Sequence, residues 1–234
     1  MHRFFCDTKQ GDYFILDKEL LHHIKVARLQ NDQFLINFQG EFYKCNLIAN
    51  TNKAIIHSKE NIDHEFKGDI VLAAPIIKPS RFEIMLEKAV ELGVKKIIPL
   101  ISHYCNRNQI EFIFGSDNKI NRLNTKIKEA AQQSFRNIIP YLDKPTELQQ
   151  IIKLYKEQNY TIYVAHELIK PSWQIDNLAT NCLILVGPEG GFSQNEIDNI
   201  CEAAGENVKL VSLGKRILRA ETAAITMLAK IKEI

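Results

Sequence analysis

The chain has 234 residues, 45% of them hydrophobic and 25% charged, with a formal net charge of +2 at pH 7, which excludes wholesale disorder. The longest apolar stretch, residues 70–77, contains Pro75 and is far shorter than the roughly 20 residues that cross a bilayer. Since the N-terminus also lacks the layout of a secretory signal, we expect a cytoplasmic protein without a membrane span.

The first part of the chain predicts a small β domain. Residues 33–58 form three short β-rich runs, QFLINF, EFYKCNLIA and KAIIHS, separated by turn residues at Gln39-Gly40 and at 50–52. A short helix is expected over 16–27, and the charged, glycine-containing segment 60–69 is typical of a linker. We therefore place a domain at 1–68 and a second at 69–234.

The second part alternates strands with amphipathic helices, which is typical of a mostly parallel sheet covered on both faces. Strands are predicted over 70–76, 96–101, 161–166 and 182–187, with Gly93 ending the first helix. Capping boxes are expected at Thr146 with Gln149 and at Ser193 with Glu196, so Glu196 is given no catalytic role. The fold class is α/β.

Two further patterns concern side chains. The last helix carries small and apolar residues on one stripe, to which a neighbouring backbone could come close, including that of a second subunit: Ala220, Ala223, Ala224, Met227, Leu228 and Ile231. The cysteines are scattered, without spacing for a metal site, and are interpreted as reduced, mostly structural thiols: Cys6, Cys45, Cys105, Cys182 and Cys201. No metal is expected.

Glycines follow two of the predicted strands. In CLILVGPEGGFSQNEID (182–198), Gly187, Gly190 and Gly191 expose backbone that could approach a ligand, although a tight strand-to-helix turn is the commoner explanation of such a glycine cluster. In VSLGKRILRAETAAITML, Gly214 precedes Arg216 and Arg219. These two arginines could contact a substrate, or they could be ordinary solvated charges of a loop. Because ligands lie beyond the carboxyl ends of strands in such sheets, these loops and the end of TIYVAH could form one pocket.

The spacing of these glycines matches neither the phosphate loop nor the dinucleotide-binding pattern, so a nucleotide-hydrolysing enzyme is disfavoured. Charge is uneven along the chain: residues 78–136 carry eleven basic and six acidic side chains (+5), 137–208 four and ten (−6), and 209–234 six and two (+4). Basic segments on either side of an acidic one are compatible with a cationic face for nucleic acid, but a mixed solvated surface is commoner.

LVGPEGGFSQNEI and SLGKRILRAETA resemble the signature of the RsmE family, bacterial small-subunit (16S) ribosomal RNA methyltransferases that act on uridine N3 and belong to the SPOUT superfamily. MHRFF, HHIKVARLQNDQ, KPSRFEIMLEKAVELGVKKIIPL and EAAQQSFRNIIP extend the resemblance almost end to end. The chain departs from the family pattern at His103-Tyr104, where many relatives carry an acidic-basic pair, and at Asn31, which replaces a usual turn glycine.

The resemblance implies a PUA-like RNA-binding β-barrel, followed by a SPOUT domain with a trefoil knot that binds S-adenosylmethionine and works as a homodimer. The implied cofactor contacts are Ala165, His166, Gly187, Pro188, Glu189, Gly190, Leu213, Gly214, Ile217, Leu218, Arg219, Thr222 and Ala223. The implied substrate is small-subunit rRNA within the assembled subunit.

Methylation at N3 displaces a weakly acidic proton, so a base or a cation that stabilises the uracil anion is needed. Arg219 is the first candidate for stabilisation, with Glu189 and Glu221 as candidate proton acceptors. Candidate RNA contacts are Arg3, His23, Arg28, Lys78, Arg107 and Arg136. A non-catalytic RNA-binding or ribosome-assembly factor on the same fold is the alternative function.

Overall fold

The computed structural model describes residues 1–167 and 174–232, which form two compact units. The first unit combines Met1–Glu65 with Ala131–Ile139, and the second combines Phe66–Ala130 with the chain from Pro140 onward. The first unit thus includes a segment that a boundary at residue 68 assigns to the second domain. No helix in the described ranges is long and apolar enough to span a membrane.

The first unit contains a six-stranded mixed sheet in the order β1-β4-β5-β6-β3-β2, in which only the β1–β4 pair is parallel. Its strands are β1 (Arg3–Phe5), β2 (Lys9–Gln10), β3 (Tyr13–Ile15), β4 (Gln33–Phe38), β5 (Glu41–Leu47) and β6 (Lys53–Glu60). Gln39 and Gly40 both have positive φ, 52° and 85°, as the predicted β4–β5 hairpin turn requires. Phe14, Phe34 and Ile36 lie at the centre of its core.

Helix α1 (Lys18–Val26) begins after Asp17, whose side chain accepts a hydrogen bond from the Leu20 N–H. His22 and His23 are both exposed on it. The residue with left-handed backbone after this helix is Arg28, at φ 58°, and not Asn31.

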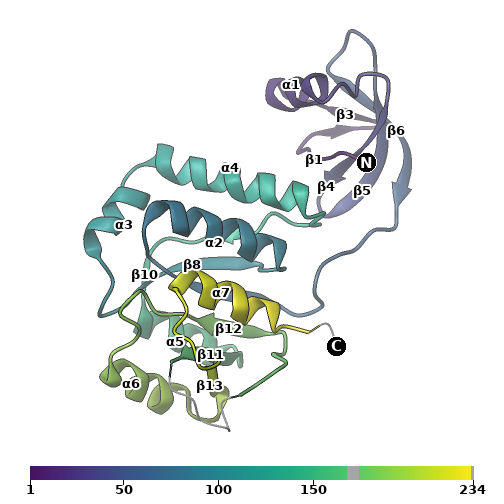
Figure 1. Cartoon of the computed structure of the whole chain (residues 1–234). Helices are drawn as coiled ribbons and strands as arrows, with labels where there is room; N and C mark the ends of the chain where they lie inside the picture. Colours follow the sequence, from purple (N-terminus) through teal and green to yellow (C-terminus); the bar gives the residue numbers. More distant parts are fainter. Residues whose placement is uncertain (168–173, 233–234) are drawn as a thin grey trace. The chain divides into compact units, whose positions relative to one another are not determined.

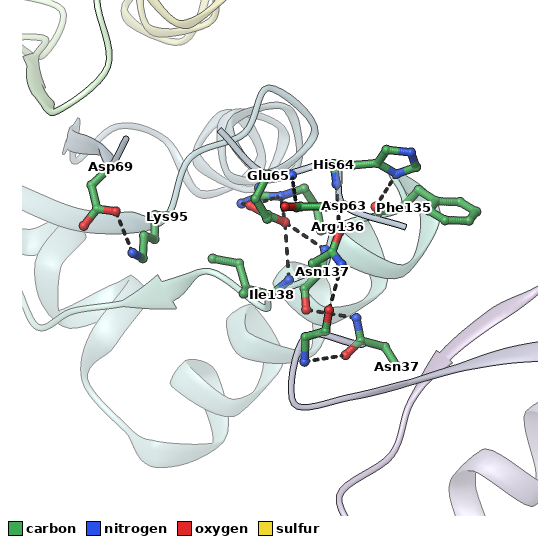
Figure 2. Close-up of polar contacts among 11 residues, drawn as sticks. Asn37, Asp63, His64, Glu65, Asp69, Lys95, Phe135, Arg136, Asn137 and Ile138 are labelled. Carbon is green, nitrogen blue, oxygen red and sulfur yellow. Dashed lines mark hydrogen bonds and ion pairs between the residues drawn. The ribbon is translucent and has the colours of Figure 1, made fainter. Parts of the chain in front are cut away.

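A buried polar network ties residues 131–139 into the first unit (Figure 2). The Asn137 side-chain amide donates to the carbonyls of Gly40 (2.7 Å) and Ile62 (2.8 Å), and its Oδ1 accepts from the His64 N–H. The Arg136 guanidinium, on a side chain that is 3% exposed, donates to both carboxylate oxygens of Glu65. This network explains why a distant segment packs with the β domain.

Replacing Glu65 by alanine is expected to lower the free energy of unfolding of the full chain by about 3 kcal/mol, because removing one partner of a buried ion pair is strongly destabilising. Glu65 also accepts hydrogen bonds from the backbone N–H groups of Asn137 and Ile138. Urea denaturation followed by circular dichroism measures the change. Glu41→Ala, which breaks an exposed pair with Lys59, is the control and should have little effect; equal effects of both variants would contradict the prediction.

The second unit is built on an all-parallel sheet in the order β10-β8-β7-β12-β11-β13, with β9 alongside β8 (Figure 1). Its strands are β7 (Ile70–Pro75), β8 (Lys96–Ile101), β9 (Tyr141–Leu142), β10 (Thr146–Glu147), β11 (Thr161–His166), β12 (Cys182–Leu185) and β13 (Val208–Ser212). The four longer predicted strands are confirmed. Their continuous apolar character reflects burial on both faces of the sheet.

Helices cover both faces of this sheet (Figure 1). The helices that follow β7 in the chain are α2 (Pro79–Glu91), α3 (Arg107–Phe114), α4 (Asp117–Gln133), α5 (Leu148–Glu157), α6 (Gln194–Ala204) and α7 (Ala220–Ala229). Helices α5 and α6 share one core with the sheet, and α7 packs on α2 and on the central strands. The alanine-rich stripe of α7 is therefore covered by α2 and the sheet of the same chain, which corrects the suggestion that a second subunit covers it.

Of the two predicted capping boxes, one is wrong and one is confirmed. Thr146 lies in β10 and donates its hydroxyl to the Lys144 carbonyl, so α5 begins at Leu148 without a capping box. The capping box at Ser193 and Glu196 is present, with the Ser193 N–H donating to Glu196 Oε2 at 2.8 Å.

All five cysteines are free thiols, and Cys6, Cys45 and Cys182 are buried. Burial raises the pKa of Cys45 and of Cys182 to about 12. Both side chains are therefore neutral apolar groups of the core, as expected for structural thiols.

Candidate functional site

The carboxyl ends of four neighbouring strands, β7, β12, β11 and β13, meet at one edge of the second sheet. The chain order reverses here, since β8 pairs with one side of β7 and β12 with the other. Such a switch point separates the connecting loops and leaves a crevice between them. The segments that leave these strands are the start of α2, residues 165–167, 186–192 and 213–219.

The loop after β12 is closed by backbone contacts of its own. The Gly191 N–H donates to the Pro188 carbonyl at 2.8 Å. A Cβ added at Gly187 would lie 2.7 Å from the Gly191 carbonyl carbon and 2.9 Å from its oxygen, closer than real Cβ atoms approach. Gly187 is thus required by space, because its loop folds back onto it.

The loop after β13 connects to α7 with little support from side chains. Gly214 has φ 102°, a conformation that favours glycine, and Ile217 is 87% exposed. Arg219 is the N-cap residue of α7 through its backbone, and its side chain is exposed. Among the described residues no carboxylate lies within ion-pair distance of Arg216 or Arg219, so both cations are available to a ligand.

These loops enclose a pocket of about 400 Å³, within the size range of small-molecule sites. The predicted cofactor residues that line it are Ala165, His166, Gly187, Pro188, Glu189, Leu213, Gly214, Ile217, Leu218, Arg219 and Ala223. Gly190 and Thr222 do not line it. Sequence reasoning did not assign the lining residues Arg81, Glu167, Val186, Gly191, Phe192, Arg216 and Ala220 to a cofactor site.

Arg81, on the first turn of α2, links two of the predicted catalytic residues. Its guanidinium lies 3.8 Å from a Glu189 carboxylate oxygen and 3.7 Å from Glu221 Oε1. Glu221 Oε2 is buried and has no hydrogen-bond partner in the described part of the chain, so Arg81 is the cation that compensates its charge. Arg81 lies more than a hundred positions from both glutamates in the sequence, so no local pattern indicates this role.

The predicted RNA contacts differ in how free their side chains are. His23, Arg28, Lys78 and Arg107 are exposed, with Arg107 3.8 Å from Glu147. Arg3 lies over the Phe135 ring at 4.4 Å and donates to the Gln133 carbonyl, and partial burial lowers its pKa.

Arg136 is different, since its guanidinium is buried against Glu65. Its assignment as an RNA contact is therefore corrected: the side chain is used inside the first unit.

Comparison with known proteins agrees with this geometry. The model of a family described as RNA methyltransferase domain matches residues 64–232. The chain is 38% identical over 232 residues to ribosomal RNA small subunit methyltransferase E of Mesomycoplasma hyopneumoniae, covering 98% of each chain, and 34% identical to the protein of that name from Rickettsia conorii, covering 91% of this chain and 86% of that one.

Among solved structures, the chain is similar to a ribosomal RNA small subunit methyltransferase E from Neisseria gonorrhoeae bound to S-adenosyl methionine. The TM-score of this comparison is 0.79, with 25% sequence identity and coverage of 98% of this chain and 95% of the other. The similarity extends over both units of the fold.

Proposed function

The chain belongs to the ribosomal RNA small subunit methyltransferase E family, and on that premise we propose that it transfers a methyl group from S-adenosylmethionine to N3 of a uridine in 16S ribosomal RNA. The observation that supports this most is the convergence of the loops after β11, β12 and β13 on one pocket that also contains Arg219. The relative solved with S-adenosyl methionine shares the fold of this pocket's scaffold.

The residues of the pocket fit this cofactor. Val186, Phe192, Leu213, Ile217 and Leu218 supply apolar surface, and the glycine loops present backbone groups without side chains in the way. A Cβ at Gly187 would meet the Gly191 backbone, so this glycine lets the loop fold tightly where it lines the pocket. Together with Ala165, Gly214 and Ala223, these residues would hold the cofactor, whose sulfonium supplies an electrophilic methyl group when bound.

In the transfer, a bond forms between N3 and the methyl carbon, the bond from that carbon to sulfur breaks, and N3 gives up its proton, which finally reaches the bulk solvent. This is an in-line displacement, for which the protein must align the groups and exclude water. Negative charge develops on the uracil as the proton leaves. We assign its stabilisation to Arg219, whose guanidinium lines the pocket without a carboxylate partner among the described residues.

Glu189 and Glu221, the candidate proton acceptors, both face Arg81. Their carboxylate oxygens lie 3.8 Å and 3.7 Å from its guanidinium. Their proposed role is to hold Arg81, and with it the start of α2, at the edge of the pocket. Arg81 is thus a positioning residue of the site.

RNA contact is proposed for basic residues of each unit: the partly buried Arg3 and the exposed His23 and Arg28 in the first, and the exposed Lys78 and Arg107 in the second. Phosphate contacts of this kind fix the register of the substrate. The first unit is proposed to be a PUA-like RNA-binding domain, and the target uridine must leave its base pair because N3 is occupied there. The trefoil knot and the homodimer expected from the family remain predictions; sedimentation equilibrium measures the latter.

Two measurements test the proposal. Calorimetry with S-adenosylmethionine and S-adenosylhomocysteine is expected to detect one site per chain. Mass spectrometry of 16S RNA from cells lacking this protein should show one uridine without its N3 methyl group, and the purified protein should restore it on assembled small subunits. A fully methylated RNA from such cells would overturn the assignment.

The alternative, an RNA-binding or assembly factor without turnover, predicts binding to the small subunit with no affinity for the cofactor. The pocket favours the enzyme, since a purely structural factor has no need of a cavity lined by glycine loops and by Arg81, Arg216 and Arg219. The calorimetric measurement separates the two.

A further inference from the structure

The turn after β8 presents two aromatic rings that the proposed reaction leaves without a role. Tyr104 is 52% exposed, and the ring of His103 lies against it edge to face, with centroids 4.7 Å apart. A tyrosine ring is a large apolar surface with a polar tip, and such a ring offers its face to another aromatic group. The position of this pair is what suggests a role for it.

The pair lies directly beside the glycine loop of the pocket. A Cβ added at Gly190 would be 3.0 Å from both Cβ and Cγ of Tyr104, so the stem of the tyrosine packs on the Gly190 backbone. The residues on either side of Gly190, Glu189 and Gly191, both line the pocket. The exposed ring of Tyr104 thus adjoins the place where transfer is proposed.

The turn is held in position by hydrogen bonds. The His103 N–H donates to Glu196 Oε1 at 2.7 Å, while the other oxygen of Glu196 is fixed in the capping box of α6. The Cys105 N–H donates to the Ser102 carbonyl at 3.0 Å. A surface fixed before the ligand arrives loses little conformational entropy on binding, which favours a recognition role.

We propose that Tyr104, supported by His103, is a stacking surface for the target uracil once that base has left its helix. Unstacked bases of RNA are typically received on aromatic side chains, and stacking tolerates a pyrimidine as well as any other base. Arg107 begins α3 three residues later, with 77% of its side chain exposed, and places a cation for the RNA backbone in the same segment. This assignment rests on the proposed function, because it concerns the substrate of that reaction.

The test compares Tyr104→Ala, Tyr104→Leu, Tyr104→Phe and Tyr104→Trp in the full-length protein, with assembled small subunits as substrate. Alanine and leucine are expected to lower the single-turnover kcat/KM about 10- to 100-fold, whereas phenylalanine and tryptophan keep it near the original value. Affinity for S-adenosylmethionine, measured by calorimetry, should be unchanged in all four variants.

Tyr141→Ala is the matched control, because Tyr141 is 62% exposed but sits on β9 opposite Lys96, at the other end of the sheet. It should leave kcat/KM unaltered. Full activity of the alanine and leucine variants, or an equal loss in all four, would overturn the stacking role. Absence of cofactor binding in the original protein would instead refute the proposed function itself.

Discussion

Replacing Gly187 by alanine is expected to weaken S-adenosylmethionine binding at least tenfold and to reduce methylation accordingly. The φ of Gly187 is not in the left-handed region, so alanine is allowed by the backbone; only space forbids it. The new Cβ would meet backbone atoms of Gly191 at 2.7–3.0 Å, and backbone cannot move aside as a flexible side chain does. Overpacking of this kind costs about 1–3 kcal/mol, and 1.4 kcal/mol corresponds to a tenfold change in affinity.

Gly205→Ala provides the control for this substitution. Gly205 has φ 57° with open space around its Cβ position, and it lies at the other end of α6, outside the residues that line the pocket. Its replacement should lower stability through backbone strain while leaving the dissociation constant of the cofactor unchanged. If Gly187→Ala is folded and binds the cofactor as tightly as the Gly205 variant, the loop does not form the binding site.

Replacing Arg219 by alanine is expected to lower the single-turnover rate of methylation about 10²- to 10³-fold with cofactor binding nearly unchanged. Removing a group that stabilises charge developing in a transition state typically has an effect of this size. Arg219 lines the pocket with no ion-pair partner among the described residues, so its charge is available to the substrate. Rapid-quench measurements with saturating cofactor and assembled small subunits report the rate.

Arg216→Ala is the comparison for charge alone. Arg216 lines the same pocket from the same loop and also lacks a carboxylate partner within the described ranges. We expect Arg216→Ala to lose less activity than Arg219→Ala, and to lose it mainly through a higher KM. Such a result separates a general electrostatic contribution from the specific one assigned to Arg219. Equal rates for Arg219→Ala and the original protein would refute the assignment.

The strands and helices with a strong apolar period could be predicted from the sequence, because burial imposes that period locally. Ser193 and Glu196 are an example, since both partners of the capping box lie within one helical turn. The same four-residue spacing at Thr146 and Gln149 was misleading, because β10 pairs with β8 there and tertiary pairing determines the local structure.

The site was predictable where it is made of loops and not where it depends on long-range contacts. Gly187 and Gly214 directly follow strands in the sequence, and the carboxyl ends of strands are where ligands bind in such sheets. Arg81 reaches the pocket only because β7 and β12 are neighbours, and Arg136 looked like a free cation because Glu65, 71 positions earlier, is not visible as its partner. The direction in which a charged side chain points is settled by the fold.

The polar network around Asn137 has a consequence for how the protein is made. The β domain is not complete when its last strand has left the ribosome. It still lacks the two hydrogen bonds from the Asn137 side-chain amide and the Arg136 guanidinium, which arrive with residues 131–139. At a usual rate of about 5–20 residues per second, several seconds of synthesis separate these events. During that interval the carboxylate of Glu65 and the carbonyls of Gly40 and Ile62 await their partners, so a nascent chain cut before residue 139 should be readily digested by protease.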